Sequence, residues 1–382
     1  MKRKKLLIIS HTEHYRNHNN EIVGWGSTIN EISYLADYWE EIVHIGCYYK
    51  NQAPQSALPY TQSNVSFVPI PSYGGKSLVD KFMILVKIPF ILKQVVKNLD
   101  GVTEVQLRLP TSMGLFLLPL FSFFIKRTFN FWVKYAGNWA QENPPISYQL
   151  QRWWLKKNFA QCKVTINGFW MNQPQHCYSF ENPCLTHEDI RNGSLIANSK
   201  TFEAPFVFTF VGRLEDSKGV TRIIEALEEI PSQKIKAVHF IGDGKDLGKY
   251  KLKSSFLKEK VFFHGFLDKI NVHEVLAESH FFLLPSASEG FPKVIAEAAC
   301  CGVLPIVSDA GSISHYVNEE NGFVWKINSN ETFAQVVQNA INESGAALKK
   351  RAETISELAE LFTFDHYYKK LNQSILGNNN RQ

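Results

Sequence analysis

The 382-residue sequence has few cysteines, and their spacing suggests neither disulfides nor a metal site. The six cysteines include no C-x-x-C pair and form no regular framework. Small secreted domains and zinc-binding modules depend on such spacings. We therefore expect reduced thiols in a cytoplasmic protein, at Cys47, Cys162, Cys177, Cys184, Cys300 and Cys301.

The sequence also lacks an apolar run long enough to cross a membrane, which needs ~20 largely uncharged residues. The run at 82–96 contains Lys87, Pro89 and Lys93, and the run at 113–126 is only 14 residues long. The apolar run that follows the basic N-terminus is too short for a signal peptide. We expect 82–96 to be a helix that covers a sheet. The alternative is a helix whose exposed end dips into a membrane interface.

The formal net charge of +5 is unevenly distributed along the chain. Residues 1–200 contain 21 basic and 13 acidic side chains, a net charge of +8, whereas residues 201–382 have a net charge of −3. A basic half suggests an anionic partner. Because no RNP, zinc-finger or helix-turn-helix pattern occurs, we expect no nucleic acid partner and favour an anionic membrane surface or a phosphorylated lipid.

Short apolar runs alternate with helical patterns along the whole chain, which is typical of parallel sheets crossed by helices. The fold class is therefore α/β, with helices expected at 27–38 and near Val220, Val272 and Phe291. The expected strands lie at 5–10, 40–46, 65–71, 104–109 and 130–137 in the first half, and at 206–212, 236–242, 260–266, 280–286 and 303–308 in the second.

The length favours two domains. The segment 187–204 is polar and has no strong periodicity, so we predict a linker there. The expected division is a first domain at 1–198, a second at 199–362 and a C-terminal helix at 363–382.

The sequence FVGRLEDSKGV joins a predicted strand to a predicted helix and has the components of a diphosphate site. Gly212 permits close approach, Arg213 and Lys218 supply positive charge, and the helix that follows Gly219 offers free N–H groups. Two further strands end in the glycine-containing turns IGDG and HGF. Each turn is a weak signal by itself, but ligands of open α/β sheets bind at such strand ends.

Two carboxylates lie in SEGFPKVIAEA, residues 288–298, directly after a predicted buried strand. Glu289 would stand at the carboxyl end of that strand, and Glu297 in the helix that follows. Carboxylates accept hydrogen bonds from vicinal hydroxyl groups but repel a diphosphate, which needs basic residues instead. The pattern therefore predicts one ligand with hydroxyl groups and a diphosphate.

GRLEDSKG, IGDG, HGF and SEGFPKVIAEA, in this order and spacing, resemble the nucleotide-sugar domain of the retaining glycosyltransferases of family 4. The resemblance is close over residues 205–330. It implies the GT-B fold, in which two Rossmann-like domains face each other across a cleft, and a last helix that returns to the first domain. The implied activity is transfer of a sugar from a nucleotide donor to a hydroxyl group of a glycan or lipid-linked glycan.

The resemblance also implies a role for each matching residue. Arg213 and Lys218 would hold the donor diphosphate and stabilise the leaving group, and Glu289 would face the transferred sugar. Donor-binding positions would be Gly212, Phe266 beside the base, the backbone of Gly290, Phe291 and Pro292, and Glu297 at the ribose.

The first half resembles the family's acceptor domain in layout more than in residues. Gly24 or Gly26 would match a glycine close to the donor phosphate. Family members carry a histidine after a later strand, but the corresponding segment here, VKYAGNWAQENPP, has none. The acceptor-side candidates are therefore Tyr135, Asn138 and Trp139.

No metal or other cofactor is expected, because the sequence has no Asp-x-Asp motif to hold a divalent ion against a diphosphate. Side-chain cations and a helix dipole can neutralise that charge instead. His11, His14 and His18 would share a face if the segment were helical, which leaves a metal site there as a weaker hypothesis.

Two other functions fit the same fold. A sugar-nucleotide 2-epimerase would need carboxylates for proton abstraction in both domains, and SEGFPKVIAEA fits the transferase better. A non-catalytic nucleotide-sugar-binding module would keep Arg213 and the glutamates without turnover. Donor hydrolysis or transfer by the purified protein separates the three.

Overall fold

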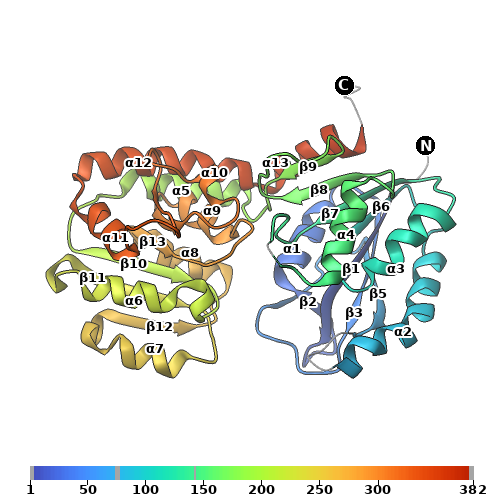
Figure 1. Cartoon of the computed structure of the whole chain (residues 1–382), viewed down its shortest axis with the longest axis horizontal. Coiled ribbons are helices and arrows are strands. Elements are labelled where there is room, and N and C mark those ends of the chain that lie inside the picture. The colour runs from blue at the N-terminus through green and yellow to red at the C-terminus, as the bar shows by residue number, and fades with distance from the viewer. Residues whose placement is uncertain (1–3, 74–77, 142, 378–382) are drawn as a thin grey trace. The chain divides into compact units, whose positions relative to one another are not determined.

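The structure is a computed structural model that describes residues 4–73, 78–141 and 143–377. The chain forms two compact units (Figure 1). Unit 1 contains residues up to Phe180 and those from Tyr368 onward, and unit 2 contains Glu181–Tyr367. The first unit thus ends at Phe180, earlier than the predicted boundary at 198.

Unit 1 is built on one sheet with nine strands in its described part. Seven strands are parallel, in the order β5-β3-β1-β6-β7-β8-β9, and β2 and β4 add an antiparallel extension beside the end of β1. All five strands predicted for this half are present. The bounds are β1 Lys5–Arg16, β2 Ile22–Trp25, β3 Glu41–Tyr48, β4 Ala57–Pro59, β5 Val65–Pro71, β6 Glu104–Leu109, β7 Asn130–Tyr135, β8 Lys163–Asn167 and β9 Cys177–Phe180.

Helices cover both faces of this sheet. The long apolar run forms α2, and its buried side chains, Ile84, Ile91 and Val95, form one helical stripe against the core. Buried residues of α3, the following π-helical turn and α4 belong to the same core cluster, so these elements cover the same face as α2. The bounds are α1 Gly26–Leu35, α2 Leu78–Lys97, α3 Gly114–Pro119, the π-helical turn Leu120–Phe124 and α4 Ile146–Lys156.

The C-terminal segment packs on unit 1. Helix α13, Phe364–Leu371, brings Tyr368 onto the ring of Tyr38, with 3.3 Å between the ring centroids. A π-helical turn at Asn372–Leu376 follows, and the Lys163 ammonium donates to the carbonyl oxygen of Ser374 at 2.7 Å. The predicted return of the last helix to the first domain is therefore present.

Unit 2 is built on a six-stranded parallel sheet in the order β12-β11-β10-β13-β14-β15, as far as the structure is described. The five strands predicted for this half are all found, and β15 is an additional short one. The bounds are β10 Phe206–Val211, β11 Ile235–Ile241, β12 Val261–Gly265, β13 Phe281–Leu284, β14 Leu304–Ser308 and β15 Phe323–Trp325.

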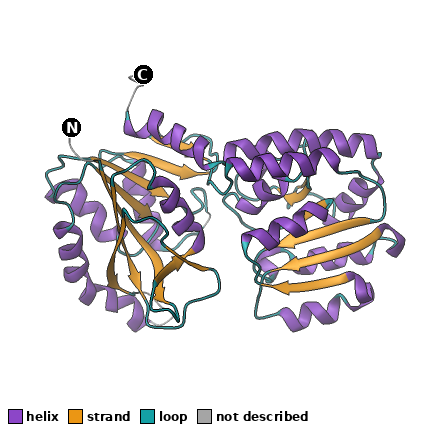
Figure 2. Cartoon of the chain, turned by 180° about the vertical axis from the view of Figure 1, so that it is seen from behind, coloured by secondary structure: helices purple, strands orange, loops and turns teal. Residues whose placement is uncertain are grey.

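Helices lie on both faces of the second sheet (Figure 2). The three helices predicted for this half begin at Val220, Lys269 and Lys293, within three residues of the expected positions. The bounds are α5 His187–Ser199, α6 Val220–Glu228, α7 Leu247–Lys253, α8 Lys269–Glu278, α9 Lys293–Cys300, α10 Ile313–Tyr316, α11 Phe333–Asn342 and α12 Gly345–Leu358.

The predicted linker is wrong, because most of it is helix α5. The Thr186 hydroxyl accepts a hydrogen bond from the backbone N–H of Asp189, and the Asp189 carboxylate accepts one from the backbone N–H of Thr186. This capping box fixes the start of the helix. Gly193 then packs against α9, where an added Cβ would lie 2.4 Å from the carbonyl oxygen of Cys300. Packing and capping thus replace the missing apolar periodicity.

None of the six cysteines forms a disulfide, and all are buried. No helix in the described part of the chain is long and apolar enough to span a membrane.

Candidate active site

The predicted site of unit 2 lies where its strand order reverses. From β10 the chain proceeds outward through β11 and β12, then returns to β13 on the other side of β10. Loops that leave β10 and β13 therefore diverge at their carboxyl ends, which is the position where open α/β sheets bind ligands. The residues singled out in the sequence, from Gly212 to Lys218 and from Glu289 to Pro292, are in these two loops.

An ion pair joins the two loops. The Lys218 ammonium lies 2.5 Å from Oε1 of Glu289, and both side chains are largely buried. The backbone supports the pair, because the N–H of Ala287 donates to the carbonyl oxygen of Ser217 at 2.9 Å. The predicted diphosphate cation and the predicted sugar-facing carboxylate thus contact each other.

Gly219 permits the close approach of the two loops. Its φ of +82° lies in the left-handed region, and a Cβ there would stand 2.3 Å from the carbonyl oxygen of Pro285. A side chain would therefore force the loops apart. Helix α6 begins at the next residue, so its free N–H groups lie one residue from Lys218.

Arg213 occupies the same loop but points into solvent. Its side chain is 77% exposed, and its guanidinium lies 3.2 Å from the carboxylate of Glu215. Its position after β10 is the predicted one, and the exposed side chain is free to turn toward a bound anion.

Asp216 fixes the turn that carries Lys218, and sequence analysis did not identify it. Its carboxylate accepts hydrogen bonds from the Thr221 hydroxyl, the Lys249 ammonium at 2.9 Å and the Tyr250 hydroxyl at 3.1 Å. The Thr221 and Lys249 contacts hold the pKa of Asp216 at about 2. Its partners come from α6 and α7, so the turn is tied to two helices.

The loop after β14 supports the backbone of Glu289 and Gly290. Both the N–H and the hydroxyl of Ser312 donate to the carbonyl oxygen of Gly290, at 3.0 and 2.9 Å. Gly311, with a φ of +65°, approaches so closely that a Cβ would lie 1.9 Å from the carbonyl oxygen of Glu289. Only glycine fits there, a requirement that the sequence DAGS did not reveal without the partner loop.

Phe291 lies in the loop between β13 and α9, and its side chain is buried in the core. Its ring stacks on Phe362 at 4.6 Å and meets Tyr316 edge-on at 4.7 Å. Pro292 then precedes the first turn of α9. The prediction that the backbone of Gly290–Pro292 contacts the donor is compatible with this packing, because the buried ring of Phe291 holds the segment against the core.

Glu297 stands in α9 near Lys293, one helical turn before it, and near Lys269 of α8, which no spacing argument linked to it. Burial raises the pKa of its carboxyl, and the ammonium groups of Lys269 and Lys293 partly oppose that rise. Lys269 also donates to the carbonyl oxygen of Cys184 at 3.0 Å and pairs with Asp189 at 2.5 Å. These contacts tie the first turns of α5 and α8 together.

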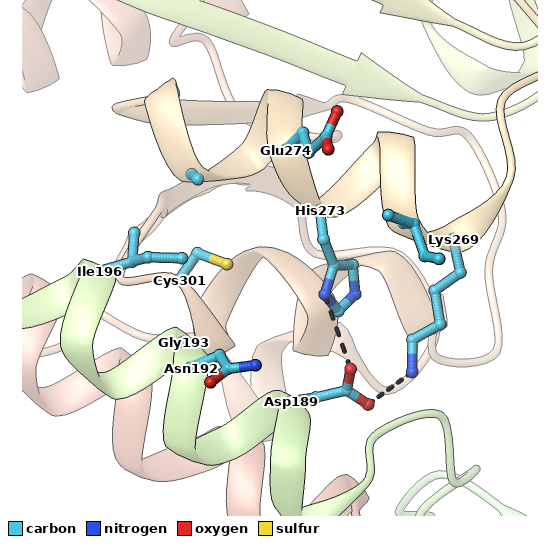
Figure 3. Close-up of a pocket in the computed structure, with 10 residues that line it drawn as sticks. Asp189, Asn192, Gly193, Ile196, Lys269, His273, Glu274 and Cys301 are labelled. Atoms are coloured by element: carbon cyan, nitrogen blue, oxygen red, sulfur yellow. Dashed lines mark hydrogen bonds and ion pairs between the residues drawn. The ribbon is translucent and has the colours of Figure 1, made fainter.

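A groove of ≈ 310 Å³ lies between α5 and α8 in unit 2 (Figure 3). Asp189, Lys269 and His273 lie at one end, and the Nδ1 atom of His273 is 3.9 Å from the Asp189 carboxylate. The rest is lined by apolar side chains such as Ile196 and Ile270, together with the polar side chains of Asn192 and Glu274. The polar end of the groove is therefore formed by the ion pair that joins the two helices.

The remaining donor-binding candidates stand at neighbouring strand ends. Gly212 follows β10, and its N–H donates to the carbonyl oxygen of Ile241 at 2.9 Å. Phe266 follows β12 with an exposed ring, available for stacking on a planar base.

The corresponding edge of unit 1 corrects part of the acceptor-side prediction. Tyr135 is 1% exposed and Trp139 is 4% exposed, and their rings pack edge-on at 4.9 Å in the core. These side chains have no surface to offer an acceptor. Asn138 is partly exposed, and its side-chain oxygen accepts from the N–H of Ala140 at 3.0 Å. It is the one of the three that remains a candidate.

Close contacts within unit 1 require glycine at positions 24 and 26. An added Cβ on Gly24 would lie 2.7 Å from the ring of His14, and one on Gly26 would lie 2.6 Å from the carbonyl oxygen of Ser56. The N–H of Gly26 already donates to that same oxygen at 3.1 Å. Gly26 is the first residue of α1, and its match to a glycine close to the donor phosphate stays a prediction.

The hypothesis of a histidine metal site is wrong. His11 and His14 lie in strand β1 rather than a helix, so the three histidines do not share a helical face. His14 stacks on Phe67 and bonds to the Tyr60 hydroxyl at 2.8 Å, and burial lowers its pKa to about 4. No group of three potential metal ligands occurs among the described residues.

Comparison with known proteins shows which family unit 2 resembles. Residues 194–360 match the family model described as glycosyl transferases group 1. Over this segment, unit 2 is similar to that family. The segment contains both loops of the candidate site, from Gly212 to Glu297.

Curated relatives align with part of the chain. A putative teichuronic acid biosynthesis glycosyltransferase from Bacillus subtilis is 31% identical over 128 residues, which cover 34% of this chain and 31% of the relative. A galactosyltransferase from Escherichia coli, described as UDP-Gal:α-D-GlcNAc-diphosphoundecaprenol α-1,3-galactosyltransferase, is 32% identical over 135 residues, 34% of each chain. The aligned segments thus span about a third of these relatives.

A solved structure shares the fold over the whole length. The Anabaena protein HepE, determined in complex with UDP and glucose, superposes with a TM-score of 0.68 at 16% identity. The match covers 98% of this chain and all of the other. The chain therefore has the GT-B fold, with two Rossmann-like domains.

Proposed function

We propose that the protein is a retaining glycosyltransferase. It moves a sugar, of hexosyl type, from a nucleotide-sugar donor to a hydroxyl group of a glycan or lipid-linked glycan in cell-surface polysaccharide synthesis. The similarity to the group 1 family supports the transfer, and the names of the two curated relatives support the class of product. The retaining course comes from the resemblance to family 4.

The ion pair between Lys218 and Glu289 is the observation that carries the proposal. It lies at the reversal of strand order, and the N-terminus of α6 follows directly. A donor needs both signs of charge at this point: positive charge for its diphosphate and a hydrogen-bond acceptor for its sugar hydroxyls. When the donor enters, the ammonium turns to the diphosphate and the carboxylate accepts from the sugar. Without a donor, the two groups neutralise each other.

Transfer breaks the bond between the sugar's anomeric carbon and the diphosphate oxygen, and the acceptor oxygen forms a new bond to that carbon. The leaving diphosphate gains negative charge as its bond breaks. Lys218, Arg213 and the N–H groups of α6 stabilise this charge more strongly in the transition state than in the ground state. The acceptor hydroxyl gives its proton to the leaving diphosphate oxygen as its bond to the anomeric carbon forms.

Glu297 accepts from the ribose hydroxyls in this scheme. Desolvation of this partly buried carboxylate raises its pKa, and hydrogen bonds donated by ribose hydroxyls would offset that cost. Phe266 stacks on the base, and the backbone of Gly290–Pro292 contacts the donor. Neutralisation by side chains and a helix dipole makes a divalent ion unnecessary.

The proposed place of work is the cytoplasmic face of a membrane. Nucleotide sugars are available in the cytosol, and a lipid-linked acceptor is held at the bilayer. The E. coli relative is named for such an acceptor. The protein would associate peripherally through the basic unit 1.

Thermal shift with UDP-, GDP- and ADP-sugars tests the donor class, and NMR of the product tests the stereochemistry. Stabilisation by one nucleotide series, followed by transfer with retention at the anomeric carbon, is expected. Conversion of the donor to its 2-epimer without an acceptor would instead indicate the epimerase. Stabilisation without hydrolysis or transfer, across a panel of lipid-linked acceptors, would indicate a binding module.

A further inference from the structure

Unit 1 exposes a group of large apolar side chains on its α3–α4 side. Phe123 and Phe124, in the π-helical turn after α3, are 67% and 78% exposed. Helix α4 adds Ile146, Leu150 and Trp153, and Phe159 follows it. We call these six side chains the aromatic face. Soluble proteins rarely gather so many exposed apolar groups without a partner.

Contacts between rings make this face continuous. Phe123 packs edge-on against Trp154 at 5.7 Å, and Phe159 packs against Trp153 at 5.1 Å and Trp154 at 5.5 Å. The Trp154 indole N–H donates to the Ser122 hydroxyl at 3.2 Å, which fixes the central ring. The exposed rings are therefore held by the fold.

A shallow groove of ≈ 190 Å³ adjoins the face between α3 and α4. Its walls are almost wholly apolar, with Leu115, Leu118 and Pro119 on one side and Leu150 and Trp153 on the other. Its shape and lining suit a hydrocarbon chain rather than a polar ligand.

The charge around the aromatic face is mainly positive. Residues 105–180 contain eight basic side chains and one acidic one, and six of the basic ones remain when Arg108 and Lys134, which are buried beside Glu31, are left out. Lys126 follows the π-helical turn, and Lys156 and Lys157 end α4; all three are exposed. Apolar rings surrounded by cations match the interface of an anionic bilayer, where rings enter the headgroup region and ammonium groups meet the phosphates.

A second copy of the chain is a poorer match, because two such faces would bring like charges together. Helix α2 covers the same face of the sheet and also exposes apolar side chains, including Leu85, Val86 and Phe90. The apolar outer layer is thus broader than the aromatic face itself.

We propose that the aromatic face is the membrane-docking surface of this protein and that its partner is an anionic lipid bilayer. The proposal builds on the proposed function by naming the surface that brings the enzyme to a lipid-linked acceptor. It extends the apolar stretch 113–126, which contains Phe123 and Phe124, because α4 contributes three of the six side chains and was not among the predicted apolar stretches.

Vesicle sedimentation of the full chain, without nucleotide or acceptor, tests the docking surface. Phosphatidylcholine vesicles are compared with vesicles that contain about 30% phosphatidylglycerol, at low and high salt. We expect binding to the anionic vesicles that is at least tenfold tighter than to the neutral ones and that weakens with salt. Because no donor is present, failure of this assay would leave the transferase proposal standing, and the donor assays would test that separately.

Two variants locate the surface. The double variant Phe123→Ser/Phe124→Ser should reduce the partition coefficient at least tenfold, whereas Leu252→Ser, which changes an exposed leucine of α7 in unit 2, should not change it. The variant Lys156→Gln/Lys157→Gln should reduce it by roughly fivefold for each charge. Its control is Lys326→Gln/Lys350→Gln in unit 2, which removes two exposed charges elsewhere.

Three outcomes would overturn the proposal. They are equal binding to neutral and anionic vesicles, no vesicle binding, and a Phe123→Ser/Phe124→Ser variant that binds like the wild type while retaining its melting temperature. A wild-type dimer that this variant converts to a monomer would show that a second copy covers the face.

Discussion

The two units hold their notable charged side chains in different places. In unit 2 the charged groups of interest, such as Lys218 and Glu289, lie in loops at the carboxyl ends of strands. In unit 1 the most notable charged group is buried: Glu31 of α1 accepts from Arg108 at 3.0 Å and from Lys134 at 2.7 Å. All three side chains of that cluster are less than a tenth exposed.

The charged groups inside unit 1 are all bonded to other protein groups, whereas the loops of unit 2 include side chains that a ligand can reach. Arg108 also donates to Gln106, and the nearby His44 bonds to Ser10 at 2.7 Å and to the Tyr60 hydroxyl. These contacts stabilise the fold of unit 1 and leave little for a substrate. In unit 2, Arg213 and Phe266 are exposed and available. Position, rather than residue type, therefore distinguishes the two sets: the unit 2 groups lie in loops at strand ends, where Arg213 and Phe266 are also exposed, whereas the unit 1 cluster is enclosed.

The largest expected effect is on stability, from Glu31→Gln. Removal of this carboxylate leaves two buried cations without their anion, and breaking such a cluster typically costs ~3–5 kcal/mol in the free energy of unfolding. Urea denaturation measures the loss. Glu41→Gln is the matched control, because it breaks the partly exposed pair with Lys5 and should cost less than about 1 kcal/mol. A loss from Glu31→Gln as small as the control's would contradict a structural role for the cluster.

In unit 2 the corresponding changes should affect turnover. Arg213→Ala and Lys218→Ala should each reduce turnover at least tenfold, because the leaving diphosphate loses a charge-assisted partner worth ~1.5–3 kcal/mol. Glu289→Gln should slow transfer more than it weakens donor binding, since it faces the reacting sugar. Steady-state kinetics with the donor identified by thermal shift give the measurement. Near-normal turnover in both cation variants would refute the phosphate role.

The sequence predicted unit 2 better than unit 1 for a physical reason. Its site consists of short contiguous segments, and each segment directly follows one strand. Residues that are neighbours in the sequence are therefore neighbours in the site, and the sequence pattern predicts them. The cluster in unit 1 joins Glu31 to residues far along the chain, Arg108 and Lys134, and no spacing pattern links them. The burial of Tyr135 and Trp139 likewise depends on the helices packed over β7, so their exposure could not be predicted.

Some errors could have been avoided and others could not. The capping box of Thr186 and Asp189 is a helix-start signal in the sequence, and it would have identified α5 in place of a linker. By contrast, Gly311 is required only because the backbone of Glu289 approaches it. Likewise, Lys269 lies near Glu297 only after α8 and α9 have packed side by side.

A smaller effect, on binding and stability together, is expected from Glu297→Gln. Nucleotide affinity should fall roughly tenfold, as one charge-assisted hydrogen bond to the ribose becomes a weaker neutral one. Calorimetric titration with the nucleotide measures this loss. An unchanged affinity would show that the ribose role is wrong.

Although Glu297→Gln should weaken nucleotide binding, it should stabilise the fold at neutral pH. The pKa of this carboxyl is raised above its ordinary value of 4.5, so the folded state binds the proton more tightly than the unfolded chain. Between pH 4.5 and the raised pKa, the free energy of unfolding therefore falls as pH increases. Glutamine does not ionise, so the variant does not lose stability in this way. Without nucleotide it should therefore melt at a higher temperature than the wild type at pH 7. The difference in melting temperature should shrink as pH approaches 4.5. Glu357→Gln, at an exposed position on α12, is the control and should show no such pH dependence.

The smallest expected effect is that of a chelator, which should leave activity unchanged. The proposed site neutralises the donor diphosphate with Lys218, Arg213 and the N–H groups of α6, and these need no bound ion to act. Free carboxylates near the diphosphate would change this expectation, but Glu289 is assigned to the sugar and contacts the Lys218 ammonium, and Glu215 contacts the Arg213 guanidinium. Turnover is measured after dialysis against EDTA and again after addition of Mg²⁺ or Mn²⁺. Complete loss in EDTA with recovery in Mn²⁺ would show that side-chain cations are not sufficient, and Glu215 and Glu289, which lie beside Arg213 and Lys218, would become the first candidates for metal ligands.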